Sequence, residues 1–145
     1  FKNITTYIQS GNIIFEYKLL EPSKIVKLIQ QKILEKFNFE VPIILLEEME
    51  LNSLIKACPF VKSKESEHVY LTFLSEYPKE ENIKKIIDLK FEFEEFIIQG
   101  KTIYLYCKKG YGKSKLSNNF FENKLKVQAT TRNWNTVLTL QEMLK

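Results

Sequence analysis

Ala129-Thr130-Thr131-Arg132-Asn133-Trp134-Asn135-Thr136 is the stretch around which the rest of the chain is organised. It contains the only Trp and the only Arg of the chain, and it ends where apolar residues begin to recur at helical spacing. That spacing predicts a terminal helix from Val137. Free N–H groups at a helix start attract anions, and Arg132 adds a planar cation, so the stretch is a candidate anion site. It equally suits a capping loop, in which Trp134 fills the core and Asn135 or Thr136 caps the helix.

The composition is that of a globular protein of one domain or of two small ones. Of 145 residues, 44% are hydrophobic, which is enough for a core, and the formal net charge is +4. Because the Lys residues are spread along the chain, this charge favours anionic partners only mildly. We find no signal-peptide pattern, and no apolar run approaches the roughly 18–20 residues of a membrane helix. Cys58 and Cys107 lack metal-type spacing, and we interpret them as reduced, packed thiols of a cytoplasmic protein.

The first half of the chain predicts a hairpin followed by helical and extended segments. Ser10-Gly11 separates two β-rich runs, and Gly supplies the positive φ of a tight turn. Pro22 suits the first position of a helix, and Pro59 ends another. The patterns predict strands over 5–9 and 12–17, a helix over 22–37, a buried strand over 42–46 and a helix from 47 to 58.

The second half begins after a polar boundary at 61–67. A change of parity at Glu94-Glu95 predicts a β-bulge. Asn119 is predicted to cap a helix, with Glu122 as its capping-box partner. The patterns predict strands over 69–74, 91–98, 102–107 and 127–131, and helices over 80–88, 119–125 and from 137.

These elements predict an α+β fold made of two tandem ferredoxin-like (βαββαβ) units. Residues 1–60 would form the first unit, which lacks its opening strand and helix, and residues 68–145 would form the second unit with the C-terminal helix. A missing strand leaves an unpaired sheet position and exposed apolar surface. We therefore expect either that an upstream segment fills the gap or that another chain does, for example in a homo-oligomer built through the incomplete sheet.

Two long motifs and one shorter motif carry a resemblance to a known family. The motifs are Thr6–Asn12 (TYIQSGN), Thr130–Thr136 (TTRNWNT) and the run Gly112-Lys113-Ser114-Lys115-Leu116. With them the chain resembles, over essentially its whole length, an uncharacterised bacterial family classed as a domain of unknown function. The resemblance implies paired ferredoxin-like units with an opening strand and helix ahead of the hairpin. It implies no reaction, substrate or catalytic residue.

The loop Gly110–Lys115 invites comparison with a phosphate-binding loop. That motif requires a Gly five residues before its second Gly, and here that position is Cys107. We therefore do not interpret this segment as a nucleotide-hydrolysing loop. Lys113, Ser114 and Lys115 still offer charge and N–H groups to a phosphate, although a plain connection between strand and helix explains them as well.

The first hairpin adds polar candidates, which either face a ligand or satisfy the backbone of the turn. Together the candidate ligand-binding residues are Gln9, Ser10, Asn12, Lys113, Ser114, Lys115, Arg132, Asn133 and Asn135. His68 lies beside no nucleophile motif, so we interpret it as a solvated strand end. The acidic runs 47–50 and 92–95 look like a helix start and a wet strand face, so we expect no metal and no cofactor.

Three functions remain open. The leading one is binding of an anionic ligand, a nucleotide or nucleic acid, near the TTRNWNT stretch. In that case, aromatic residues on the predicted strands could stack on bases; they are Tyr70, Phe73, Tyr104 and Tyr106. The second is an enzyme acting on a phosphorylated small molecule held by the Lys113–Lys115 run and Arg132. The third is a structural or oligomerising module.

Overall fold

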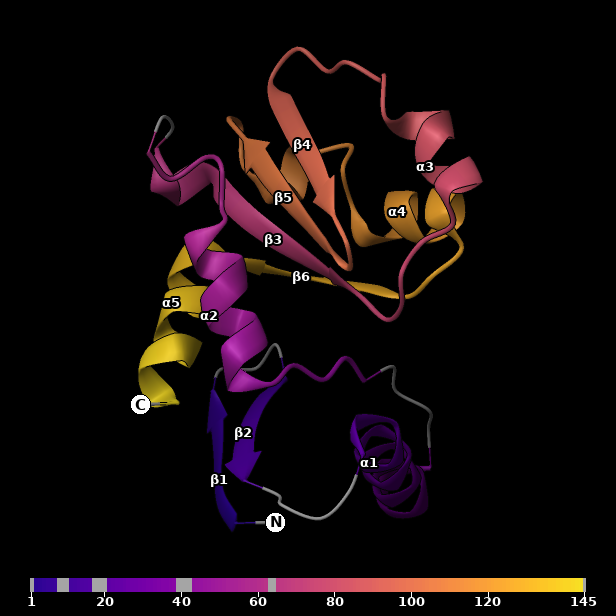
Figure 1. Ribbon diagram of the computed structural model, residues 1–145, viewed down its shortest axis with the longest axis vertical. Coiled ribbons are helices and arrows are strands. Elements are labelled where there is room, and N and C mark those ends of the chain that lie inside the picture. Colours follow the sequence, from indigo (N-terminus) through magenta and orange to yellow (C-terminus); the bar gives the residue numbers. More distant parts are fainter. Residues whose placement is uncertain (1, 8–10, 17–20, 39–42, 63–64, 145) are drawn as a thin grey trace.

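The structure, a computed structural model, describes residues 2–7, 11–16, 21–38, 43–62 and 65–144. Its elements fall into a small N-terminal part and a larger C-terminal part (Figure 1). Their bounds are β1 Lys2–Tyr7, β2 Asn12–Glu16, α1 Pro22–Phe37, α2 Glu48–Lys56, η1 Ser66–His68, β3 Val69–Leu74, α3 Glu80–Ile86, β4 Glu94–Gln99, β5 Thr102–Cys107, η2 Tyr111–Lys113, α4 Asn118–Leu125, β6 Ala129–Asn133 and α5 Trp134–Met143.

The N-terminal part contains the predicted hairpin and the predicted helix. Strands β1 and β2 pair antiparallel, and Gly11 has the positive φ of +84° that the turn was expected to need. Helix α1 begins at Pro22, as predicted, and ends at Phe37; the next residue, Asn38, caps it in a left-handed conformation with φ of 59°. The backbone N–H of Asn38 donates to the Leu34 carbonyl and so closes the last turn.

The strand predicted over 42–46 is not formed by the residues that are described there. Pro42 lies outside the described residues, and 43–46 have no strand partner among the described strands. Ile44 and Leu46 nevertheless pack against the core, which accounts for their apolar character. Helix α2 follows with a reciprocal capping box, in which Glu47 accepts from the backbone N–H of Glu50 and the Glu50 side chain accepts from that of Glu47.

The larger sheet has the strand order β4-β5-β3-β6, and all of its neighbouring strands are antiparallel. Strand β3 therefore lies between two partners, and Thr72 sits opposite Ile103 on one side and Thr131 on the other. Strand β4 begins at Glu94 instead of Phe91, and its pairing with β5 continues without interruption to Gln99. The predicted bulge at Glu94-Glu95 is therefore wrong.

Helices cover both faces of this sheet (Figure 1). On one face, α2 and α5 enclose a buried cluster that includes Leu71, Tyr104 and Trp134. On the other face, α3 and α4 enclose a second cluster that includes Leu105 and Phe121. Both faces of β3 and β5 are buried for this reason, which is why these two strands read as almost continuous apolar runs.

Two helix starts differ from the predicted ones. Ser117, and not Asn119, caps α4 by accepting from the Phe120 backbone N–H at 3.2 Å. Glu122 accepts instead from the Ala129 backbone N–H at 3.1 Å and so ties α4 to β6. Helix α5 begins at Trp134, three residues earlier than predicted, because the polar residues before Val137 are already helical. No helix of the described residues combines the length and apolar character needed to cross a membrane.

Both cysteines are free and buried, in agreement with their interpretation as packed thiols. Burial raises the pKa of Cys107 to about 11, against a hydrogen bond to Ser114 that acts in the opposite direction. Burial also raises the pKa of Cys58. The element order and the two antiparallel sheets establish a mixed α+β fold for the described residues.

The raised pKa of Cys107 predicts a loss of stability at alkaline pH. Its thiol stays protonated in the folded state up to a pKa of about 11, whereas the unfolded thiol ionises near 9.0. The unfolded state therefore loses this proton first, and its ionisation favours unfolding as pH rises through that interval. Between about pH 8 and about pH 10, we expect this group to remove roughly 1 kcal/mol of unfolding free energy. Urea titrations at several pH values measure it. In Cys107→Ala, this part of the pH dependence of the unfolding free energy should be absent. If the unfolding free energies of both proteins fall equally with pH, Cys107 is not its source.

Candidate functional site

Arg132 occupies a defined position on β6. Its Nε donates to Asn12 Oδ1 at 2.7 Å, and its Nη1 donates to Thr130 Oγ1 at 2.8 Å and to the Thr131 carbonyl at 2.9 Å. The side chain is half-buried, and this burial lowers the pKa of the guanidinium. An arginine nevertheless remains protonated at neutral pH, so the site carries a fixed positive charge.

The bond to Asn12 joins two segments that lie 120 residues apart. Asn12 is the first residue of β2, and Arg132 belongs to the strand that leads directly into α5. The hairpin stretch and the TTRNWNT stretch therefore meet in space, which their sequences alone did not decide. We call this contact between Asn12 and Arg132 the clasp.

The start of α5 uses Asn133 as its cap. Asn133 Oδ1 accepts from the backbone N–H of Thr136 at 2.8 Å, so the prediction of Asn135 or Thr136 as the cap is wrong. Trp134 is buried in the core, as the capping-loop interpretation expected. Asn135 is exposed one residue further on. The candidates Gln9 and Ser10 lie outside the described residues.

The loop after β5 is largely satisfied by its own contacts. Ser114 Oγ accepts from the Leu116 backbone N–H at 2.9 Å, and Cys107 Sγ donates to the same oxygen at 3.6 Å. The Lys115 backbone N–H donates to a Glu94 carboxylate oxygen at 3.2 Å. These contacts engage the Ser114 hydroxyl and place an acidic group beside the loop. Both features make the loop a poor phosphate cradle.

The loop and Arg132 lie on opposite faces of the sheet. Tyr111 belongs to the loop, and its hydroxyl donates to Thr131 Oγ1 at 3.3 Å. Thr131 also donates to Asn118 Oδ1 at 2.6 Å on the α4 side of the sheet. Because successive side chains of a strand point to opposite faces, Arg132 points to the α5 side. The structure thus brings Asn12 and Arg132 together and separates the loop of Lys113, Ser114 and Lys115 from them.

The aromatic residues predicted to stack on bases are engaged in the interior. Phe73 and Tyr104 are buried, and the Tyr104 hydroxyl donates to the Leu54 carbonyl at 2.8 Å. Tyr70 packs on Tyr111 with ring centroids 5.4 Å apart, and Tyr106 packs on Phe60 at 6.1 Å. The prediction fails for Phe73 and Tyr104, because β3 and β5 have helices on both faces.

His68 belongs to a polar group that sequence reasoning missed. It lies in η1 just before β3, and its Nε2 is 3.5 Å from a Glu65 oxygen and 3.6 Å from a Glu67 oxygen. Its ring meets Tyr106 edge-on, with centroids 5.9 Å apart. These three ligand-type side chains converge within 4.8 Å of one another. The signal was the short spacing between His68, interpreted only as a solvated strand end, and the acidic Glu65 and Glu67 of the boundary before it.

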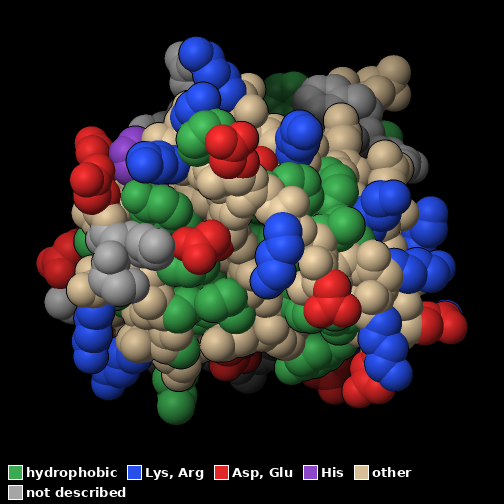
Figure 2. Space-filling model, turned by 90° about the horizontal axis from the view of Figure 1, so that it is seen from above, with side chains coloured by type: hydrophobic (Ala, Val, Ile, Leu, Met, Phe, Trp, Pro, Cys, Tyr) green, Lys and Arg blue, Asp and Glu red, His purple; other side chains and the backbone are tan. Residues whose placement is uncertain are grey.

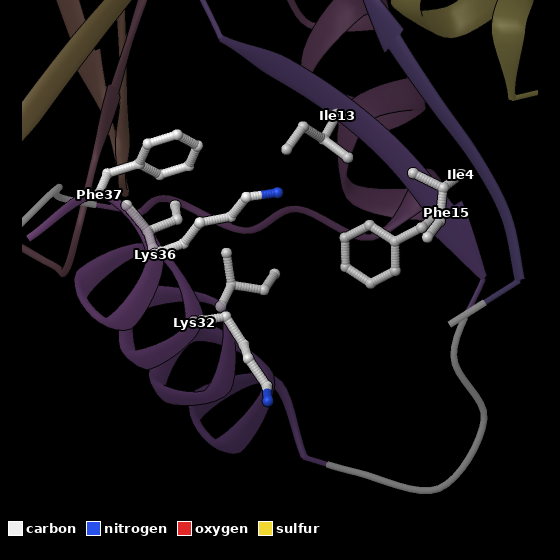
Figure 3. Close-up of a pocket in the computed structure, with 8 residues that line it drawn as sticks. Ile4, Ile13, Phe15, Lys32, Lys36 and Phe37 are labelled. Carbon is white, nitrogen blue, oxygen red and sulfur yellow. The ribbon is translucent and has the colours of Figure 1, made fainter.

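Among the hollows in the described part of the chain are two of similar size. One of about 330 Å³ lies between α1 and the hairpin, and its lining includes Ile13 and Phe37 (Figure 3). The other, of about 370 Å³, lies between α2 and the β4–β5 turn, where Met49, Tyr77 and Lys101 contribute. Neither lining includes a described candidate ligand-binding residue. The clasp therefore lies outside both of these hollows.

Comparison with known proteins gives a family and a fold. The family model described as "Protein of unknown function (DUF1697)" matches residues 1–104. The chain belongs to this family, which confirms the predicted membership of a family of unknown function. A solved structure, that of the conserved bacterial protein SP0830 from Streptococcus pneumoniae, is similar with a TM-score of 0.69. The two chains are 19% identical, and the match covers 99% of this chain and 81% of the other. No curated protein matches the chain.

The clasp predicts a measurable contribution to the docking of the hairpin. In Asn12→Ala, Arg132 Nε loses its described acceptor, and we expect a loss of about 1 kcal/mol of unfolding free energy, since the site is only half-buried. Hydrogen exchange of the β2 amides should accelerate by the factor that this free energy corresponds to, about fivefold. Asn123→Ala, an exposed position on α4, is the matched control and should leave the exchange of the β2 amides nearly unchanged. Equal behaviour of the two variants would show that the clasp does not hold the hairpin.

Proposed function

We propose that this DUF1697 protein binds an anionic ligand, a nucleotide or nucleic acid, at the clasp between β2 and β6. The observation that carries the proposal is the fixed guanidinium of Arg132, held by Asn12 Oδ1 at 2.7 Å and by Thr130 Oγ1 at 2.8 Å. A pre-oriented guanidinium can receive a phosphate or carboxylate with little further loss of side-chain freedom.

The start of α5 supports the same choice of ligand. The positive end of a helix lies at its N-terminus, and α5 begins two residues after Arg132. Asn133 already accepts from the Thr136 N–H, so the helix contributes chiefly through its dipole. The guanidinium and the dipole have the same sign and reinforce each other towards an anion.

The charge pattern on one face of the molecule offers no track for a long nucleic acid. On the face shown in Figure 2, Lys side chains are interspersed with Asp and Glu, and they do not form a continuous basic stripe. A strand of nucleic acid is usually bound along such a stripe. Since Phe73 and Tyr104 are buried, recognition would rest on phosphate charge and not on base stacking by these rings. A nucleotide is therefore the preferred member of the class.

An enzyme acting on a phosphorylated small molecule receives less support. It would need Lys113, Ser114 and Lys115 to act together with Arg132 on one substrate. Thr131 contacts the loop on the α4 side, whereas Arg132 points to the other side of the sheet. The two halves of such a phosphate site would lie on opposite sides of a packed sheet.

The architecture that underlies the proposal is a tandem of ferredoxin-like units, 1–60 and 68–145, in a cytoplasmic protein. For the second unit, the support is its β-α-β-β-α-β order together with the strand order β4-β5-β3-β6. There the opening strand β3 lies between β5 and β6. By the same plan, an opening strand of the first unit would lie between β2 and residues 43–46, which accounts for the missing pairing of 43–46.

A second candidate function, self-association through the incomplete first sheet, is favoured by one observation. The β1–β2 sheet has only two described strands, and Ile4 and Ile13 are 60% and 50% exposed. Two-stranded sheets are marginal alone, and exposed apolar strands attract further strands. Sedimentation of the chain over a hundredfold range of concentration should then reveal a dimer that Ile13→Lys weakens. A monomer at every concentration would exclude it.

The anionic-ligand proposal predicts saturable binding of ATP that depends on Arg132. Removing the charge in Arg132→Gln should weaken binding by about tenfold or more, because a charge-assisted hydrogen bond contributes about 1.5–3 kcal/mol. Added salt should weaken binding to the wild-type chain as well. Isothermal titration with ATP, inorganic phosphate and a single-stranded oligonucleotide measures this and separates nucleotide from nucleic acid.

Two controls keep this result interpretable. Lys124→Gln removes an exposed charge from α4, on the opposite face of the sheet, and should leave the ATP affinity unchanged. Hydrogen exchange verifies that the hairpin of Arg132→Gln remains docked. Equal ATP affinity of wild type and a correctly folded Arg132→Gln would refute the proposal.

A further inference from the structure

Three side chains that can bind a metal ion meet just ahead of β3. They belong to the segment 65–68, which leads through η1 into the larger sheet. His68 Nε2 lies 3.5 Å from a Glu65 carboxylate oxygen and 3.6 Å from a Glu67 carboxylate oxygen, and all three ligand atoms lie within 4.8 Å of one another. The acidic runs at 47–50 and 92–95 contain no His. This group therefore differs from them in its chemistry.

Hydrogen bonds do not account for the arrangement of these side chains. An N–H···O hydrogen bond spans about 2.7–3.2 Å, and both separations from His68 Nε2 are longer. This nitrogen can carry one N–H, which points in one direction, yet the nitrogen lies almost equally far from two carboxylates. The two carboxylates also repel each other, because their charges have the same sign. A cation between the three atoms would attract both carboxylates and accept the lone pair of a neutral imidazole.

The separations are close to those between two ligands of one zinc ion. Zinc lies about 2.0–2.1 Å from an imidazole nitrogen and about 2.0–2.2 Å from a carboxylate oxygen, with tetrahedral angles between its ligands. Two such ligand atoms are therefore about 3.3–3.5 Å apart. The two carboxylate side chains are each 72% exposed, so they can rotate to close the remaining distance around an ion.

The backbone and the core hold the histidine in position. The His68 backbone N–H donates to the Glu65 carbonyl at 3.1 Å, and this 3₁₀ turn places the two side chains above one another. The His68 ring meets Tyr106 edge-on, and Tyr106 packs in turn on Phe60. The next residue, Val69, is fully buried. An ion therefore finds one ligand already oriented and has only to draw in two carboxylates.

We propose that Glu65, Glu67 and His68 bind one divalent transition-metal ion, Zn²⁺. One imidazole nitrogen and two carboxylates suit zinc and balance its charge, whereas Mg²⁺ and Ca²⁺ prefer ligand sets made of oxygen. Three protein ligands leave a fourth position for water or for an anionic group. The site uses neither Asn12 nor Arg132, so it does not depend on the nucleotide proposal.

The test titrates the 145-residue chain, prepared without a histidine tag, with zinc chloride in a calorimeter. We expect saturable one-to-one binding. His68→Gln and Glu67→Gln should each weaken it by at least about tenfold, since even the loss of a group that only orients a metal ligand costs about 10–100-fold in affinity. His68 is the only His of the chain, so its ring resonances report on the site directly. They should shift saturably with Zn²⁺ and stay in place with Mg²⁺ at the same concentration.

Glu76→Gln provides the matched control. It removes the same charge as Glu67→Gln from an exposed position beyond the other end of β3, and it should leave the zinc affinity unchanged. Cys58 and Cys107 are buried, so their thiols do not compete for zinc in the folded chain. Circular dichroism verifies that each variant is folded.

Three results would each overturn the inference. The first is an equal zinc affinity of wild type, His68→Gln and Glu67→Gln. The second is binding of Mg²⁺ as tight as that of Zn²⁺, which indicates unspecific attraction to surface carboxylates. The third is zinc binding that occurs only as two chains associate, measured by sedimentation with and without zinc, because the ion would then be shared between molecules.

Discussion

The position of β3 between β5 and β6 is the constraint on which the rest of the structure depends. It fixes Arg132 opposite Leu71 and Thr131 opposite Thr72. Alternation along β6 then sends the two neighbours to different faces, Thr131 towards Tyr111 and Asn118 and Arg132 towards the hairpin. A shift of one residue would exchange these faces, bury the guanidinium beneath α4 and release the hairpin. The register of one strand pair thus places both the structural contacts and the candidate ligand site.

Much of the fold was predictable, because local chemistry and tertiary structure agree there. Gly11 marks a hairpin, Pro22 a helix start and Val69–Leu74 a strand, and each is observed. The failures have physical reasons. Residues 43–46 are apolar because they pack on the core, and apolar character does not reveal whether a partner strand is present. Each helix start offers two residues that can cap it: Ser117 or Asn119 for α4, and Asn133 or Asn135 for α5. Packing decides which of the two is used, and this shifts the helix start by a residue or two.

The site was only partly predictable for a related reason. The unusual residue Arg132 drew attention, but its bond to Asn12 spans 120 positions and follows from the arrangement of the sheets. The Lys113–Lys115 run looked similar by residue type, yet the same strand alternation puts it on the other face.

We propose that Arg132 is held in place by Asn12 and receives an anion there, and the uniqueness of this arginine offers a direct test. Since the chain has one Arg, its side-chain Nε–H gives a single resonance in a nitrogen-edited NMR spectrum. We expect this resonance to be protected from exchange with water, to lose protection in Asn12→Ala, and to shift saturably on titration with ATP. An Nε–H that exchanges as fast as that of a free arginine, and that does not move when ATP is added, would contradict it.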